Sequence, residues 1–215
     1  MISVILPSMK RVSKLLRSVK NIQETTPGHE VEIVVVLNAD DRASHEALEG
    51  KNLHIVDMPL DCPPGRPHKC WQAGYKASSG QWVVQTADDV IFNPDWLNVL
   101  EIPNKGFIGL REVCWHDMMA TLFMATPEYI ETMMGGHFGL PWYYVAWSDN
   151  EITYRAKQNG TFAMSKELQF THMNFNYAKE APDEYGVIAT RYYGADQVTF
   201  SARLKANFPS VWPEV

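Results

Sequence analysis

Two adjacent aspartates, Asp88 and Asp89, have the residue type and spacing that most directly suggest chemistry, because they follow an apolar run at 82–84. Neighbouring carboxylates repel one another and are costly to bury unless a cation or a hydrogen-bond donor lies between them. A solvated turn over 86–95 is one interpretation of this stretch. The other is a metal site at the carboxyl end of a strand, where carboxylate oxygens suit Mg²⁺ or Mn²⁺.

The first half of the chain alternates apolar strand runs with segments of helical spacing. The pattern predicts strands at 2–7, 31–37, 53–58 and 81–87, and helices at 10–25, 43–50 and 69–79. Such alternation predicts right-handed crossovers and an α/β fold, with a mainly parallel sheet flanked by helices. Ligands of such sheets bind outside the carboxyl ends of the strands, where the aspartate pair falls.

The alternation of strand and helix patterns is less regular in the second half of the chain. The pattern predicts a strand at 107–113, a strand-turn-helix at 120–130, a glycine-rich and aromatic loop at 135–147, a helix at 148–160 and a strand at 167–175. Ser148 or Asp149 is the expected cap of that helix, and Gly160 its stop. The polar stretch at 177–194 has no clear periodicity and is expected to form a functional loop or lid.

Composition narrows the class of protein. The 215 residues, of which 46% are hydrophobic, fit a single domain with a real core. With 19 Lys and Arg against 25 Asp and Glu, the net charge of -6 gives no basic surface for nonspecific nucleic-acid binding.

Three cysteines without a CxxC pair favour a reducing cell interior, so we expect the protein in the cytoplasm. The apolar start at 1–9 is too short for a signal peptide, and no window has the roughly 18 apolar residues of a membrane span.

The order of these motifs resembles the family-2 glycosyltransferases, which have the Rossmann-like GT-A fold. In that family a glycine-containing block precedes a DxD motif and a Pro-Asp turn, and an ED pair opens a later helix that carries an Arg. The residues that fit this frame are Gly74, Ala77 or Ser78, Gly80, Asp89, Pro94, Asp95, Leu97, Asp149 and Arg155. The resemblance covers about residues 1–175. It implies a nucleotide-binding half at 1–97, an acceptor-binding half at 98–175 and a C-terminal loop or lid and helix at 176–215.

The chain also departs from the family's pattern. Ala87 stands where the first acid of the DxD motif falls, and Ser148 replaces the Glu of the ED pair. Leu37 stands where an Asp usually contacts the nucleobase, and Trp71 and Gln72 replace an Arg-Asn pair. The resemblance therefore leaves the identity of the base open, with a UDP-sugar favoured.

The resemblance assigns roles around the aspartate pair. Asp89 becomes a metal ligand by position, and Asp88 a ligand of the ribose hydroxyls. His172 lies where many GT-A enzymes place a further metal ligand and would favour Mn²⁺ over Mg²⁺, with a structural histidine as the alternative. The remaining nucleotide contacts are expected from Pro7 and Ser8 after the first strand, and from Asn38 and Asp40, or Asp41, after the second.

Three other groups are candidates for contacts with the substrates. Lys69, together with Arg66, could offset the charge of the diphosphate, and Arg191 could close over it as part of a lid. Lys10 and Arg11 are further cations near the phosphates or, equally, solvated residues at a helix start. Aromatic residues at 142–144 and Trp147 could stack on sugars or bases, although for Trp147 packing against the sheet is preferred.

Asp149 is the expected catalytic base. An acceptor hydroxyl must lose its proton as the new bond forms, and Asp149 matches the position of the family's base. A place at the start of a helix predicts a low pKa for this carboxyl. A plain helix cap is the alternative, and Glu151 is a second carboxylate in the same turn.

These residues together suggest a metal-dependent, inverting glycosyltransferase acting on a hydroxyl acceptor. A polysaccharide or a hydroxymethylated DNA base of a phage would be a suitable acceptor, although the acidity of the chain argues against DNA. A noncatalytic relative that binds a sugar nucleotide is one alternative. A nucleotidyltransferase is another, but the segment 6–16 lacks the glycine-rich loop that such enzymes carry after the first strand.

Overall fold

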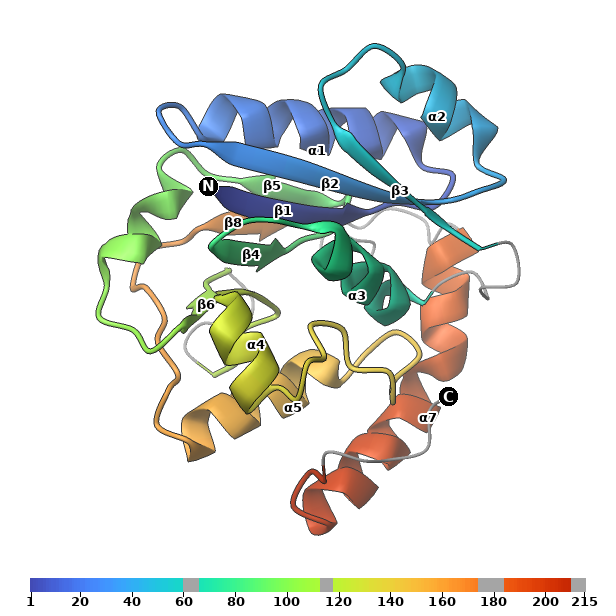
Figure 1. The fold of residues 1–215 in the computed structure, drawn as a ribbon. Helices are drawn as coiled ribbons and strands as arrows, with labels where there is room; N and C mark the ends of the chain where they lie inside the picture. The colour runs from blue at the N-terminus through green and yellow to red at the C-terminus, as the bar shows by residue number, and fades with distance from the viewer. Residues whose placement is uncertain (60–65, 113–117, 174–183, 210–215) are drawn as a thin grey trace.

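The computed structural model describes residues 1–59, 66–112, 118–173 and 184–209. Its centre is a six-stranded sheet (Figure 1). The strand order is β3-β2-β1-β4-β7-β6. Its strands are β1 (Ile2–Pro7), β2 (Val31–Asn38), β3 (His54–Met58), β4 (Trp82–Gln85), β6 (Phe107–Leu110) and β7 (Leu122–Ala125). Two further strands, β5 (Val90–Phe92) and β8 (Phe170–His172), form a separate antiparallel pair.

The sheet is mainly parallel, as predicted. Strand β1 pairs in parallel with β2 and β4, and β2 with β3, whereas β7 runs antiparallel to both β4 and β6. Residues 4–6 of β1 and 34–37 of β2 have no exposed side-chain surface on either face. Burial on both faces explains why these strands are continuous apolar runs rather than alternating ones.

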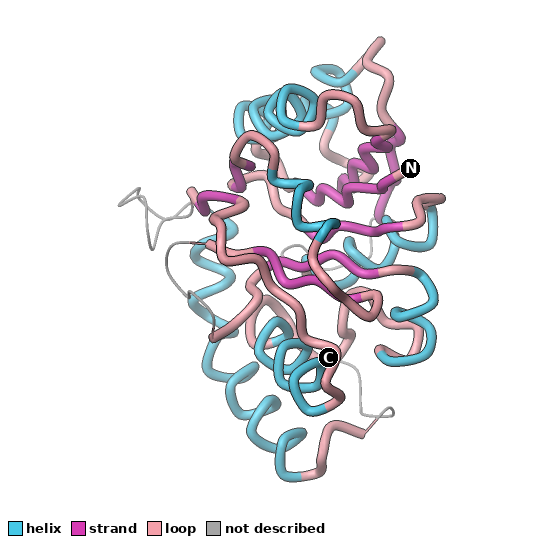
Figure 2. The backbone as a smooth tube through the Cα atoms, turned by 90° about the vertical axis from the view of Figure 1, so that its left-hand side faces the viewer, coloured by secondary structure: helices cyan, strands magenta, loops and turns pink. Residues whose placement is uncertain are grey.

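Helices cover both faces of the sheet (Figure 2). On one face lies a core that includes α1 (Val12–Thr25), the end of α2 (Arg42–Leu48), β5 and the 3₁₀ helix η1 (Trp96–Glu101). The core on the other face includes α3 (Pro67–Ala77), α4 (Pro127–Met133) and α5 (Ser148–Gln158). Successive β1 residues, Val4 and Ile5, belong to different cores, as the period of two in a strand requires.

The stretch at 177–194 is not all loop as predicted, because α7 (Glu184–Lys205) is a helix of 22 residues. Its buried side chains include Asp196 and Arg203, which are 1% and 0% exposed. A helix that packs through buried polar groups lacks the apolar stripe by which a sequence reveals a helix. No helix among the described segments has the length and apolar character needed to cross a membrane.

The start of α5 also differs from the expectation. Trp147 is the N-cap residue, with a φ of 68°, and Ser148 and Asp149 lie inside the helix. The prediction that one of those two residues caps the helix was therefore wrong. The strand predicted at 167–175 is shorter than expected, at Phe170–His172, and its residues 174 and 175 lie outside the described part.

Candidate active site

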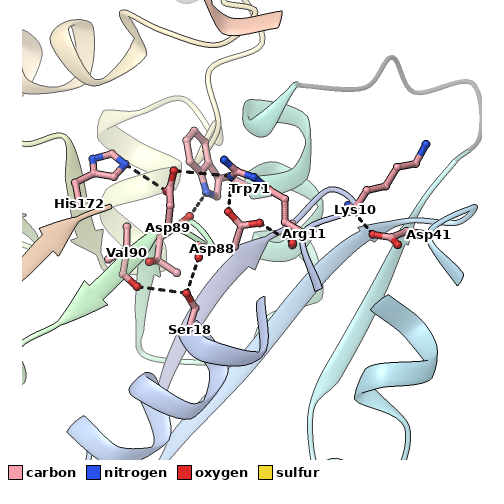
Figure 3. Close-up of polar contacts among 11 residues, drawn as sticks. Lys10, Arg11, Ser18, Asp41, Trp71, Asp88, Asp89, Val90 and His172 are labelled. Carbon is pink, nitrogen blue, oxygen red and sulfur yellow. Dashed lines mark hydrogen bonds and ion pairs between the residues drawn. The ribbon is translucent and has the colours of Figure 1, made fainter. Parts of the chain in front are cut away.

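The turn that carries the aspartate pair leaves β4 in the middle of the sheet. Trp71 on α3 lies beside the aspartate pair (Figure 3), and its indole N–H donates to the carbonyl oxygen of Thr86 at 2.8 Å. The backbone N–H of Thr86 donates to the carbonyl oxygen of Ile5 in β1. Asp88 and Asp89 are only 2% and 5% exposed. The interpretation of this stretch as a solvated turn is therefore wrong.

Asp88 is held by donors from the loop after β1 and from α1. The hydroxyl of Ser8 and the guanidinium of Arg11 each donate to its carboxylate at 2.6 Å, and the hydroxyl of Ser18 donates to its backbone oxygen at 2.8 Å. Burial raises the pKa of Asp88 to about 6, although the positive charge of Arg11 opposes that shift. All of these partners are protein groups, so the binding of ribose hydroxyls by Asp88 stays a prediction.

Asp89 faces His172, which the pairing of β5 with β8 brings to it. Val90 is opposite His172 in this pair, and the backbone N–H of Met173 donates to the carbonyl oxygen of Asp89 at 2.7 Å. His172 Nε2 lies 3.4 Å from Asp89 Oδ1 (Figure 3). These two residues, 83 positions apart, are the pair that the sequence predicted as metal ligands.

The two side chains shift each other's pKa. Burial acts to raise the pKa of Asp89, but the hydrogen bond and charge of His172, with the charges of Arg11 and Lys14, outweigh it and hold that pKa below its usual value. Burial acts to lower the pKa of His172, yet Asp89 and Glu112 together raise it to about 9. The aspartate pair is thus surrounded by positive charge from Arg11 and His172.

The donor atoms at this point fit a small divalent cation. Neighbouring ligands of an octahedral ion with bonds of about 2.1 Å lie about 3 Å apart, close to the 3.4 Å between Asp89 Oδ1 and His172 Nε2. A carboxylate oxygen with an imidazole nitrogen suits Mn²⁺. No group of three or more His, Cys, Asp or Glu side chains in the described segments has the arrangement of a complete metal site. A cation there would need further ligands from the substrate or from water.

Glu112, which belongs to none of the sequence motifs, is a further carboxylate of this cluster. Its side chain is 2% exposed, and its Oε2 lies 3.7 Å from Nδ1 of His172. The only signal in the sequence is a charged residue two positions after an apolar strand, which is typical of many surface loops.

Asp149 is half-buried at the start of α5. Burial raises its pKa to about 6 despite hydrogen bonds from the backbone and side-chain N–H groups of Asn150, and the negative charge of Glu112 adds to the rise. The prediction of a low pKa from the helix dipole was therefore wrong, because desolvation outweighs the dipole. A carboxylate with this pKa is largely ionised at pH 7 and can accept a proton there.

Glu151 does not offer an alternative base. It is completely buried, and its two oxygens accept from Nε and a terminal N–H group of Arg203 at 2.7 Å each. The hydroxyl of Tyr143 donates to it at 2.7 Å as well. With a further donor from Arg155 at 3.4 Å, this carboxylate is held in the core and cannot reach an acceptor hydroxyl, which leaves Asp149 as the candidate.

The residues predicted to hold the nucleoside lie at the ends of β1 and β2. Pro7 and Asn38 are the last residues of these strands, and Asp40 is exposed, with its carboxylate 3.9 Å from Lys10 Nζ. Asp41 is 3% exposed and caps α2 by accepting from Ser44, while it also accepts from the backbone N–H of Lys10 at 2.8 Å. Asp41 is thus committed to the fold, whereas Asn38 and Asp40 keep their predicted role toward the base as an expectation.

The other predicted diphosphate cations come from the start of α3 and from α7. Lys69 is half-buried in the first turn of α3. The guanidinium of Arg66 lies 4.3 Å from the ring centre of Tyr144, which stacks on Tyr192 of α7 at 4.2 Å. Arg191 is exposed on α7, so it belongs to a helix and not to the loop expected at this position. Its contact with a diphosphate stays a prediction.

The aromatic residues before α5 mostly pack inside the protein. Trp142 and Tyr143 are 2% and 1% exposed, and Trp142 lies under the guanidinium of Arg203. Trp147 packs against the buried core, but its ring contacts Phe200 of α7, with 5.2 Å between ring centres, and not a residue of the sheet as expected. Stacking of a sugar on Trp142 or Tyr143 is therefore excluded by their burial, and the half-buried Tyr144 is already stacked on both faces.

Among the solved structures that share this architecture are several glycosyltransferases. A mannosyltransferase from Pyrobaculum calidifontis, solved with GDP-mannose and Mn²⁺, matches with a TM-score of 0.69 at 18% identity, over 99% of this chain and 65% of that one. The chain has a GT-A fold. Glucosyl-3-phosphoglycerate synthase from Mycobacterium tuberculosis, solved with Mn²⁺, UDP and glucosyl-3-phosphoglycerate, matches with a TM-score of 0.63 at 14% identity, over 94% and 80% of the two chains.

A third GT-A structure, a Drosophila β-1,4-galactosyltransferase 7 variant with manganese, UDP-galactose and xylobiose, matches with a TM-score of 0.57 at 15% identity, over 83% of this chain and 73% of that one. At such identities the likeness establishes the fold. The chain spans 65% of the length of the mannosyltransferase chain. No protein-family model and no curated protein sequence matches the chain.

Proposed function

We propose that the chain is a metal-dependent, inverting glycosyltransferase that moves a sugar from a nucleoside diphosphate to a hydroxyl acceptor. The observation that carries the proposal is the convergence of Asp89 and His172, with 3.4 Å between Oδ1 and Nε2, at the carboxyl end of β4. In an open α/β sheet this edge is where ligands bind. The GT-A fold and the donors named in the matched structures support the same reading.

Asp89 and His172 would hold Mn²⁺ or Mg²⁺. The bound cation would stabilise the negative charge that grows on the diphosphate as the glycosidic bond breaks. Arg11 already neutralises Asp88, at 2.6 Å, so the site can accept the metal and the diphosphate without leaving two bare carboxylates side by side.

Asp149 would remove the proton of the acceptor hydroxyl. The pKa of about 6 leaves this carboxylate mainly ionised at pH 7 while keeping it more basic than an ordinary aspartate. A single base of this kind is what direct displacement at the anomeric carbon requires, and this supports transfer with inversion.

For the donor we favour a UDP-sugar, because two of the three matched structures described above contain UDP or a UDP-sugar and the other contains GDP-mannose. For the acceptor we favour a glycan or another hydroxyl compound over a hydroxymethylated DNA base, since the net charge of -6 opposes a polyanion.

The odd number of cysteines supports action in the cytoplasm.

The test is a screen of UDP- and GDP-sugars with Mn²⁺, read both by thermal shift and by hydrolysis of the donor. We expect one donor to raise the melting temperature in a Mn²⁺-dependent way and to be slowly hydrolysed. Stabilisation without any hydrolysis or transfer would point to a noncatalytic sugar-nucleotide-binding protein. Absence of stabilisation by every donor would contradict the proposal.

A further inference from the structure

A buried carboxylate lies behind the candidate metal ligand His172. Glu112 is 2% exposed, and the hydroxyl of Thr121 donates to its Oε1 at 2.5 Å. Its other oxygen, Oε2, lies 3.7 Å from His172 Nδ1. A carboxylate is costly to bury unless hydrogen-bond donors or positive charge compensate it. Thr121 supplies a donor to Glu112, and the ring of His172 can supply positive charge.

The ring of His172 separates Glu112 from Asp89. Nε2 faces Asp89 at 3.4 Å, and Nδ1 faces Glu112 at 3.7 Å, which is an ion-pair distance and longer than a hydrogen bond. Because the two nitrogens point away from different edges of the imidazole, a cation bound between Nε2 and Asp89 lies on the side of the ring opposite Glu112. Glu112 is therefore placed to act on the histidine and not on the cation.

The backbone fixes this arrangement from both sides. The chain leaving β6 is tied to the residue before β8, because the N–H of Gln169 donates to the carbonyl of Arg111 and the N–H of Arg111 donates to the side chain of Gln169, each at 2.9 Å. Arg111 directly precedes Glu112, and Gln169 is three residues before His172. The carboxylate and the imidazole are thus carried by segments that cannot move apart independently.

We propose that Glu112 is a positioning residue that fixes the orientation and tautomer of His172, so that Nδ1 keeps its proton and Nε2 presents its lone pair to the cation shared with Asp89. Carboxylates that accept from the second nitrogen of a metal-bound histidine orient the ring and increase its basicity as a ligand. This role rests on the proposed function, since it needs a divalent cation at Asp89 and His172.

The first test measures Mn²⁺ affinity in the presence of UDP from the electron paramagnetic resonance signal of free Mn²⁺. Glu112→Gln keeps the size of the side chain but replaces the carboxylate by a neutral amide, which is a weaker acceptor for the Nδ1 proton of His172 and has a donor NH2 group at one of the two oxygen positions. We expect the affinity for Mn²⁺ to fall by about 10–100-fold, the usual effect of losing such a partner. Glu167→Gln removes the same charge from an exposed position and should leave the affinity unchanged.

A double-variant comparison separates positioning from direct coordination. If Glu112 acts through His172, then Glu112→Gln should cause no further loss of Mn²⁺ affinity in a His172→Ala background. Losses that add in the double variant would show that Glu112 binds the cation itself and would overturn the proposal. An unchanged affinity in folded Glu112→Gln would overturn it too.

A second measurement needs no substitution at Glu112 and covers the case in which that variant does not fold. In the parent protein with Mg²⁺ and UDP, ¹⁵N nuclear magnetic resonance of the His172 ring should show a proton on Nδ1 and none on Nε2. The opposite tautomer would overturn the proposal while leaving the proposed function intact. A parent that does not bind Mn²⁺ even with UDP would overturn both.

Discussion

Arg203 on the C-terminal helix holds Glu151 on α5 through two hydrogen bonds of 2.7 Å, and both side chains are completely buried. Glu151 lies two residues after Asp149, so this pair ties the helix of the candidate base to α7, which begins 35 residues after Asp149 in the chain. The carboxylate of Asp196, also on α7, accepts from the backbone N–H groups of residues 144–146 just before α5. The C-terminal helix therefore supports the segment that presents Asp149.

Removing Arg203 should destabilise the fold strongly. In Arg203→Met the charge of Glu151 stays buried with only the more distant Arg155, 3.4 Å from its Oε1, as a cation, and breaking such a buried pair typically costs about 3–5 kcal/mol. Denaturant unfolding of the variant measures this loss. Lys205→Met, at an exposed position on the same helix, should change the stability by less than about 0.5 kcal/mol. The double variant Glu151→Gln with Arg203→Met should lose less than Arg203→Met alone, and an equal or larger loss would contradict this account.

Asp149→Asn should abolish most of the turnover without affecting donor binding. The amide cannot accept a proton, so the rate of transfer should fall by roughly two to four orders of magnitude. The melting temperature should stay within a few degrees of the parent, because Trp147 and not Asp149 is the N-cap residue. Asp95→Asn is a matched control at an exposed left-handed position that Asn tolerates, and it should transfer at the parental rate. Near-normal transfer by Asp149→Asn would remove Asp149 from the chemistry.

The pH dependence of transfer should report the same carboxyl. Burial and the nearby charge of Glu112 raise the pKa of Asp149 to about 6, although the hydrogen bonds from Asn150 oppose them. The base is active only when ionised, so kcat/KM should be at its full value above about pH 7 and should fall roughly tenfold per unit below about pH 5. A profile that is flat between pH 5 and 8, measured at saturating Mn²⁺, would contradict the assignment.

The sequence predicted the parts of this molecule that depend on local patterns. The apolar runs of β1, β2 and β4 specify a parallel sheet, and the position of Asp89 four residues after the end of β4 places it at the ligand-binding edge. A helix was expected within 176–215, but its early start at Glu184 was not, because the packing of α7 relies on Asp196 and Arg203, which are polar residues that a hydrophobic pattern counts as surface.

The remaining features depend on contacts between distant segments. Glu112 reaches His172 only because the chain after β6 lies against the start of β8, a pairing that no spacing in the sequence encodes. The direction of the pKa shift of Asp149 was wrong for a similar reason, since a helix start is a local feature but burial is a tertiary one. Local sequence therefore indicates which residues lie near the site, and the fold decides their ionisation and partners.

The central claim is that Asp89 couples nucleotide binding to a divalent cation. Calorimetric titration of UDP into the parent and into Asp89→Asn, with Mn²⁺ and with EDTA, tests it most directly. Because Asp89 is buried against His172, circular dichroism must first show that the variant keeps the parental fold. We predict that Mn²⁺ increases the affinity of the parent for UDP at least tenfold and that Asp89→Asn binds UDP with one weak affinity in both conditions. A folded Asp89→Asn variant that still binds UDP more tightly with Mn²⁺, to the same extent as the parent, would contradict the account.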